Sequence, residues 1–111
     1  KPQRSDKLGI KKAGQWIREN SHIQSPAILS DSFRNAYYAG GKHVHIERIE
    51  QAINLAREKK ADYMLITQKE YEIIEKKMQQ FVRSGQIVLV YKYPEKKSLN
   101  RRNVLLFKIL H

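Results

Sequence analysis

The chain lacks cysteine altogether, is poor in acidic residues and contains no long apolar run. Without cysteine it has no disulfide framework, no thiolate metal site and no cysteine nucleophile. This absence assigns no compartment, because such a chain suits oxidising and reducing surroundings alike. No stretch of about 18 apolar residues occurs, so no segment of the sequence would span a membrane as a helix. The glycine-rich and nucleophile-elbow signatures of dinucleotide-binding proteins, P-loop proteins and α/β-hydrolases are also missing.

The shortage of acidic residues leaves a strongly basic chain. Its 111 residues include 22 Lys and Arg against 11 Asp and Glu, which gives a formal net charge of +11 at pH 7. Residues 1–20 carry +4 of this excess and residues 86–111 carry +5, whereas the middle of the chain is nearly balanced. Attraction to any anionic partner should therefore depend on the two ends of the chain.

The length suits one compact domain. Residues 1–6 are polar and are predicted to form a linker or frayed end, and residues 7–111 are predicted to form a single α/β domain. The chain starts at Lys1 and not at methionine. We therefore expect it to be a fragment of a longer protein.

The first predicted helix is capped by Asp6 and carries apolar residues at near-helical spacing. Gly9 and Gly14 should each weaken this helix by up to about 1 kcal/mol. We expect the helix to depend on the packing of Trp16 and Ile17 against a larger surface.

Eight further elements are predicted from apolar periodicity, caps and turn residues. Thr67 and Glu70 have the spacing of a capping box, and Gly85 is placed to end the helix that follows them. The predicted strands are 27–30, 42–46, 61–66, 86–93 and 104–109, and the predicted helices are 33–39, 47–60 and 67–84. Strands that alternate with helices favour right-handed crossovers and a mostly parallel sheet. The fold expected is a three-layer α/β/α sandwich with an antiparallel C-terminal hairpin.

Two histidines have spacing that permits metal binding. His43 and His45 are two apart on a predicted strand, so both side chains should point to one face. Glu47 would lie on the same face if the strand continued, which would give a third ligand. The alternative is two ordinary polar positions near a strand end.

The predicted helix 33–39 carries a candidate ligand site. Arg34 and Tyr38 are four apart and share a face, and in an open α/β sheet ligands bind beyond the carboxyl ends of strands. Arg34 could pair with phosphate while Tyr38 stacks on a sugar or base. Packing of the tyrosine on the sheet is the alternative. Asp31, at the end of the preceding strand, is either a functional acid or a helix cap.

The connection between the last two strands is strongly basic and lies close to Tyr91 and Tyr93. Basic residues beside aromatic rings suit nucleic acid, and they also suit anionic lipid head groups. A third interpretation is a solvated loop that prevents aggregation at a sheet edge. The basic residues in question are Lys96, Lys97, Arg101 and Arg102.

Three segments in this order carry a family resemblance: GQWIRENS at 14–21, RNAYYAG at 34–40 and ADYMLI at 61–66. They resemble the soluble C-terminal domain that follows the transmembrane helices in some bacterial membrane glycosyltransferases. These enzymes belong to the protein-mannosyltransferase-like group of the GT-C superfamily. The resemblance extends from about Leu8 to Ile109, which is nearly the whole chain.

The resemblance implies transfer of a sugar from a polyprenyl-phosphate carrier at the extracytoplasmic face of the cell membrane. The catalytic acid of the family belongs to a loop between the first membrane helices, so no catalytic residue carries over to this chain. We expect a non-catalytic accessory domain without cofactor or metal, beside the transmembrane part of the same polypeptide. Arg34, Tyr38, Lys42 and the basic loop are its predicted contacts with acceptor, carrier or anionic lipid. A nucleic-acid-binding α/β module is the alternative, and a small-molecule site at the strand ends is a third.

Overall fold

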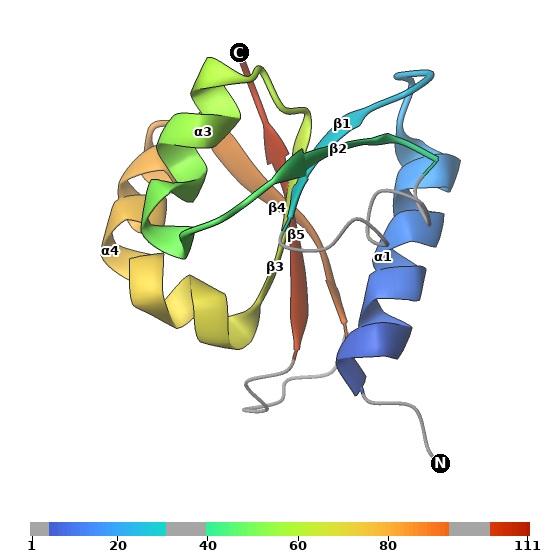
Figure 1. Ribbon diagram of the computed structural model, residues 1–111, viewed down its shortest axis with the longest axis horizontal. Coiled ribbons are helices and arrows are strands. Elements are labelled where there is room, and N and C mark those ends of the chain that lie inside the picture. Colours follow the sequence, from blue (N-terminus) through green and yellow to red (C-terminus); the bar gives the residue numbers. More distant parts are fainter. Residues whose placement is uncertain (1–4, 31–39, 94–102) are drawn as a thin grey trace.

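The computed structural model describes residues 5–30, 40–93 and 103–111 (Figure 1). Within these ranges the chain forms three α-helices, one short 3-10 helix and five strands. In chain order they are α1 (Ser5–Asn20), β1 (Ala27–Ser30), β2 (Lys42–His45), η1 (Ile49–Gln51), α3 (Ala52–Glu58), β3 (Tyr63–Thr67), α4 (Gln68–Arg83), β4 (Ile87–Tyr93) and β5 (Val104–Ile109). The helix predicted over 33–39 lies outside the described residues. None of the described helices is both long enough and apolar enough to cross a membrane.

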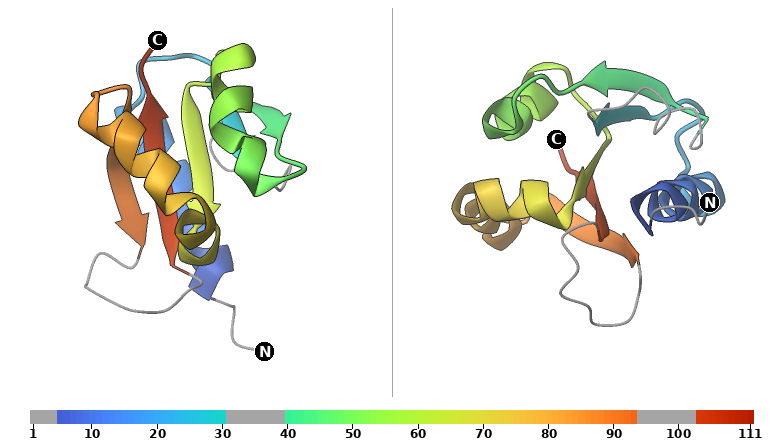
Figure 2. Two further views of the ribbon diagram at one scale, coloured as in Figure 1. Left: turned by 90° about the vertical axis from the view of Figure 1, so that its left-hand side faces the viewer. Right: turned by 60° about the horizontal axis from the view of Figure 1, so that its bottom comes forward.

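The strands form one mixed sheet in the order β2-β1-β3-β5-β4. β1 pairs in parallel with β2 and β3, whereas β5 pairs antiparallel with both β3 and β4. The antiparallel C-terminal hairpin is confirmed, but it does more than add an edge. Because β5 returns into the space between β3 and β4, both of its pairings are antiparallel (Figure 2). The expected dominance of parallel pairing is therefore not what the sheet shows.

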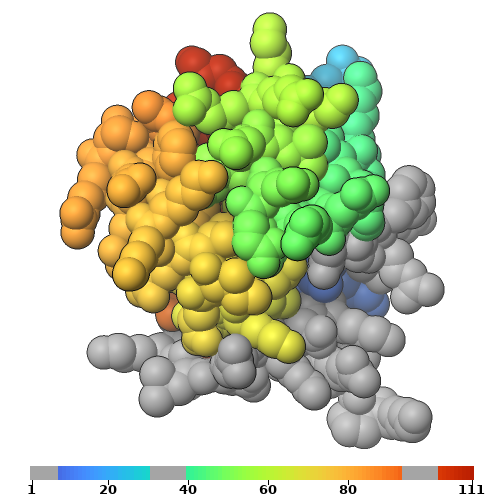
Figure 3. Space-filling view, turned by 60° about the vertical axis from the view of Figure 1, so that its left-hand side comes forward, coloured from blue at the N-terminus to red at the C-terminus, as the bar shows by residue number. Residues whose placement is uncertain are grey.

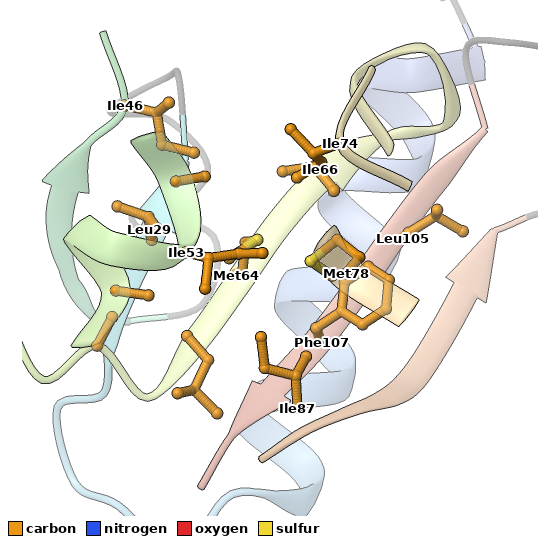
Figure 4. Close-up of a cluster of buried hydrophobic side chains, with 14 residues drawn as sticks. Leu29, Ile46, Ile53, Met64, Ile66, Ile74, Met78, Ile87, Leu105 and Phe107 are labelled. Carbon is orange, nitrogen blue, oxygen red and sulfur yellow. The ribbon is translucent and has the colours of Figure 1, made fainter. Parts of the chain in front are cut away.

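Alternating side chains divide the core into two apolar clusters on opposite faces of the sheet. One cluster includes Leu29, Met64 and Phe107 and lies under α3 and α4 (Figure 4). The other includes Ile28 and Leu106 and lies under α1. Figures 1 and 2 show α1 on one side of the sheet and the other two helices on the opposite side. The single-residue alternation therefore gives β1, β3 and β5 two buried faces, whereas β2 and β4 at the sides of the sheet are mostly exposed or half-buried.

Gly9 allows α1 to approach the sheet closely. A Cβ atom at this position would lie 2.7 Å from Val104 Cγ2 and 3.1 Å from Tyr93 Cδ1. The cost in helix propensity expected for this glycine is thus offset by packing that a larger residue would disturb. The contact holds the amino end of α1 beside the end of β4 and the start of β5.

Trp16 and Ile17 anchor the second half of α1, as predicted. The Ile17 side chain is buried. The Trp16 ring centroid lies 6.5 Å from that of Tyr63 and 6.4 Å from that of Tyr91. Asn20 Nδ2 donates a hydrogen bond of 2.9 Å to the Trp16 carbonyl in the last turn of the helix. Aromatic packing therefore holds α1 across β3 and β4.

The predicted capping box at the start of α4 is confirmed. Glu70 N donates to Thr67 Oγ1 at 3.2 Å, and Thr67 N donates to Glu70 Oε1 at 2.9 Å. After Arg83 the helix ends at Ser84, and Gly85 takes a positive φ of 79°. Both boundaries follow from local chemistry that the sequence displays.

Candidate functional site

The predicted contact residues fall in three places, of which the structure describes one. Lys42 opens β2 and is exposed. Arg34 and Tyr38 lie outside the described residues, as does Asp31. The basic residues between β4 and β5 lie outside them too: Lys96, Lys97, Arg101 and Arg102.

The strand ends fix the sheet edge from which each of these segments leaves. β1 ends at Ser30 and β4 ends at Tyr93, and both strands run in the same direction, so residues 31 and 94 start from the carboxyl edge of the sheet. The pairing of Tyr93 with Val104 brings the chain back to that edge. Lys42 pairs with Ala27, the first residue of β1, and so lies at the opposite edge. A strand length of about 10 Å therefore separates Lys42 from the edge where the basic loop is anchored.

α1 brings the amino-terminal basic region to the same carboxyl edge. Gly9 lies against Tyr93 and Val104, the two residues at the open end of the β4–β5 hairpin. Figure 1 shows the first turns of α1 and this end of the hairpin at the same end of the molecule. We call this region the basic end and define it by residues 8–12, 91–93 and 103–105.

The chain that forms or adjoins the basic end carries most of the excess charge. Lys12 is exposed and Lys92 is partly exposed. Charges within about 10 Å of one another act together at 0.1 M salt, since that is the Debye length. Residues 1–12 and 92–102 contribute Lys1, Arg4, Lys7, Lys11, Lys12, Lys92, Lys96, Lys97, Arg101 and Arg102 against Asp6 and Glu95. Of these, Lys11, Lys12 and Lys92 are described and lie at the basic end, whereas the others adjoin it in the sequence.

The tyrosines beside the basic loop are used for packing. The Tyr91 ring lies against Trp16, and Tyr93 lies against α1 at Gly9. Single-stranded nucleic acid is usually bound by aromatic rings on which bases can stack. Both tyrosines are half-buried and contact α1, and Tyr91 borders the core, so part of the aromatic surface that favoured nucleic acid in the sequence is used in packing.

His43 and His45 lie on one face of β2, as predicted, with ring centroids 5.6 Å apart. His43 Nε2 lies 3.1 Å from the carbonyl oxygen of Ser30, to which it can donate a hydrogen bond. Within the described part of the chain, no three His, Cys, Asp or Glu side chains are grouped so that they could hold a metal ion, and Glu47 does not complete such a group. The geometry favours a polar pair on an edge strand.

Two of the segments that carry the family resemblance contact each other. Trp16, in the first segment, packs edge-on against Tyr63 in the third. Asp62 Oδ2 accepts a 2.8 Å hydrogen bond from Ala27 N and so ties the start of β1 to the turn before β3. These motif residues build the core and the sheet.

A pocket between α3 and α4 was missed by the sequence analysis. It has a volume of about 430 Å³ and lies at the amino edge of the sheet, opposite the basic end. Arg57 Cζ lies 5.7 Å from the centroid of the Phe81 ring at this pocket. Arg57 follows Ile53 by four residues, which places a cation at the flank of an apolar stripe. The sequence could therefore have indicated a cation beside the apolar face of this helix. The contact of Arg57 with Phe81 depends on how α3 and α4 pack.

Tyr71 has a perturbed pKa but belongs to the core. Its ring stacks on Phe107, with centroids 5.9 Å apart and planes inclined by 10°. Burial raises the pKa of Tyr71 above its ordinary value of 10.0 because the phenolate is desolvated, and the charge of Glu75 raises it further. The shift reflects packing between α4 and β5.

Comparison of the chain with models of protein families, with curated proteins and with solved structures finds no match.

Proposed function

We propose that this chain is an extracytoplasmic accessory domain of a membrane glycosyltransferase that uses a polyprenyl-phosphate sugar. The basic end binds the anionic head groups of the membrane or of the carrier lipid. The domain turns over no substrate by itself and works beside the transmembrane part of the same polypeptide. The resemblance of residues 14–21, 34–40 and 61–66 to such domains supports this proposal.

The observation that carries the membrane contact is the packing of Gly9 on Tyr93 and Val104. This contact brings Lys11 and Lys12 of α1 to the same end of the sheet as Lys92 of β4. A cluster of basic side chains attracts acidic lipid by about 1 kcal/mol for each residue near the membrane surface. The contacts of Tyr91 and Tyr93 with α1 leave less ring surface on which bases could stack, which favours a lipid surface over nucleic acid as the partner.

The direction of α1 fits the same proposal. In the family that the chain resembles, the membrane helices precede the soluble domain, so the connection would enter at the first turn of α1. That turn lies at the basic end (Figure 1). Lys12 and Lys92 would then lie near the membrane.

The fold class proposed with this function is a three-layer α/β/α sandwich in which β1 to β4 run one way and β5 is reversed. The two buried clusters on opposite faces of the sheet support it. The strand directions follow from the pairings.

Cosedimentation of the purified chain with lipid vesicles tests the proposal. We expect weak binding to vesicles of zwitterionic lipid and strong binding when acidic lipid is added. The strong binding should fall as salt is raised, because screening shortens the reach of exposed charges. Binding that does not change with lipid charge would contradict the proposal.

A matched pair of double variants locates the contact. Lys96→Ala with Lys97→Ala should lower the affinity for acidic vesicles by about 30-fold, which corresponds to about 1 kcal/mol per residue. Lys59→Ala with Arg83→Ala removes the same charge from the carboxyl ends of α3 and α4, at the opposite edge, and should change the affinity by less than about threefold. Equal losses would show that net charge alone matters. If the chain binds single-stranded or double-stranded DNA or RNA more tightly than acidic vesicles, and in a salt-dependent way, then its partner is nucleic acid and not lipid.

A further inference from the structure

The pocket between α3 and α4 combines an apolar floor with one cation at its mouth. Its floor is formed by side chains that are almost fully buried, and Phe81 forms a half-buried wall. Figure 3 shows α3 and α4 side by side on this face, and Figure 4 shows Ile53 and Ile87 directed into the cluster below them. The described lining is Ile53, Ala56, Arg57, Phe81, Gln86, Ile87, Ile109, Leu110 and His111.

The described part of the chain offers Arg57 no carboxylate partner. Its guanidinium lies over the face of Phe81 at 5.7 Å, which restricts the long side chain and keeps the charge beside the pocket. None of the nine described lining residues is acidic, and Arg57 forms no ion pair with any described residue. A guanidinium with this planar geometry is suited to two parallel hydrogen bonds with a carboxylate or phosphate.

Besides Arg57, the polar side chains of the described lining are Gln86 and His111, and polar atoms supply about half of the exposed lining. His111 Nε2 lies 2.8 Å from the Ala61 carbonyl oxygen and is engaged there. Gln86 is exposed at the rim. A sugar or a nucleotide base needs several directed hydrogen bonds, whereas an apolar chain or ring needs only the floor that is present.

We propose that this pocket binds a small amphiphile with a carboxylate or phosphate head on an apolar chain or ring. Arg57 would bind the oxyanion, and Ile53, Ile87 and Ile109 would contact the apolar body. A volume of about 430 Å³ falls within the range of small-molecule sites and suits a ligand of about twelve non-hydrogen atoms. The pocket lies at the sheet edge opposite the basic end, so this inference does not depend on membrane binding.

Titration of the full 111-residue chain with decanoate, kept below its micelle concentration, tests the site. Binding is followed by the NMR chemical shifts of isoleucine methyl groups and backbone amides. We expect saturable shifts at Ile53, Ile87 and Ile109 with a Kd of about 1 mM, the scale reached by ligands of this size. Decyl phosphate should shift the same methyl groups, whereas neutral decanamide should bind about tenfold more weakly.

Variants at the mouth separate the charge from the apolar floor. Arg57→Gln should weaken decanoate binding about tenfold and leave decanamide binding unchanged. Arg57→Lys keeps the charge and should recover most of the affinity. Lys59→Gln removes a charge two residues away that does not line the pocket, and it should change the Kd by less than about twofold.

Three results would overturn the proposal. The first is equal affinity for decanoate and decanamide, and the second is an Arg57→Gln variant that binds decanoate normally. The third is a set of shifts that does not saturate or that lies away from the pocket. If Arg57→Gln fails to fold, the comparison of decanoate with decanamide on the natural chain still decides the question.

Discussion

Replacement of Gly9 by alanine tests the contact on which the basic end depends. The new Cβ atom would lie 2.7 Å from Val104 Cγ2 and 3.1 Å from Tyr93 Cδ1, so α1 or the end of β5 must move. Val104 is buried and β-branched, which leaves it few alternative rotamers. The clash therefore cannot be relieved by a flexible side chain.

The change in the free energy of unfolding that we expect for Gly9→Ala is the difference between two opposing effects. Overpacking of a buried contact costs about 1–3 kcal/mol. Alanine in place of glycine in a helix returns about 1 kcal/mol. We therefore expect Gly9→Ala to lower the free energy of unfolding by up to about 2 kcal/mol. In a chain with Val104→Ala, where the nearest methyl group is absent, the same substitution should cost about 1 kcal/mol less.

Urea unfolding provides the assay, because Trp16 is the single tryptophan and lies on α1 against the sheet. Its fluorescence reports detachment of α1, and far-ultraviolet circular dichroism reports the whole domain. Coincident transitions would show that α1 unfolds with the sheet. The double-mutant cycle of Gly9→Ala with Val104→Ala then isolates the coupling between the two positions.

A matched cycle supplies the control. Gly85 has a φ of 79° and no atom within 4 Å of an added Cβ, so Gly85→Ala introduces backbone strain without a clash. It should be additive with Val104→Ala to within about 0.5 kcal/mol. If Gly9→Ala is equally additive, or if it stabilises the domain by itself, the close approach of α1 to β5 is refuted.

Three further predictions concern other parts of the fold. Gly41→Ala should destabilise by about 3 kcal/mol, because its Cβ would meet the Pro26 carbonyl that pairs β1 with β2, and an unchanged urea midpoint would contradict this. Thr67→Ala removes the acceptor for Glu70 N and should cost about 1 kcal/mol in urea unfolding, whereas Thr67→Ser should cost much less. The raised pKa of Tyr71 implies stability that is fully present below the ordinary value of 10.0 and is lost as pH rises through the higher folded value. Tyr71→Phe should remove this alkaline loss when unfolding free energy is measured from about pH 9 to pH 11.5.

The candidate site could be predicted only in part from the sequence. The excess of charge at the two ends of the chain is visible in composition, but the position of Lys12 and Lys92 at one end of the sheet depends on Gly9 and Val104, which are 95 positions apart. Lys42 was predicted to share a contact surface with the basic loop. It lies at the opposite sheet edge because β2 runs parallel to β1. No short-range sequence pattern could predict the contact of Arg57 with Phe81, because it forms where α3 packs beside α4.

By itself the sequence determined the type and order of the described elements, because these depend on interactions over three or four residues. Some bounds were wrong: α1 begins at Ser5, so Asp6 lies inside the helix and does not cap it, and the helix predicted over 47–60 divides into η1 and α3. The exchange of hydrogen bonds between Thr67 and Glu70 is such a case, and so is the alternation of β5 between its two buried faces. The tertiary structure alone decided that β5 lies between β3 and β4 and that Trp16 reaches both Tyr63 and Tyr91. Those contacts join distant segments whose apolar faces would each fit several partners. Only the simultaneous packing of both sides of the sheet selects among them.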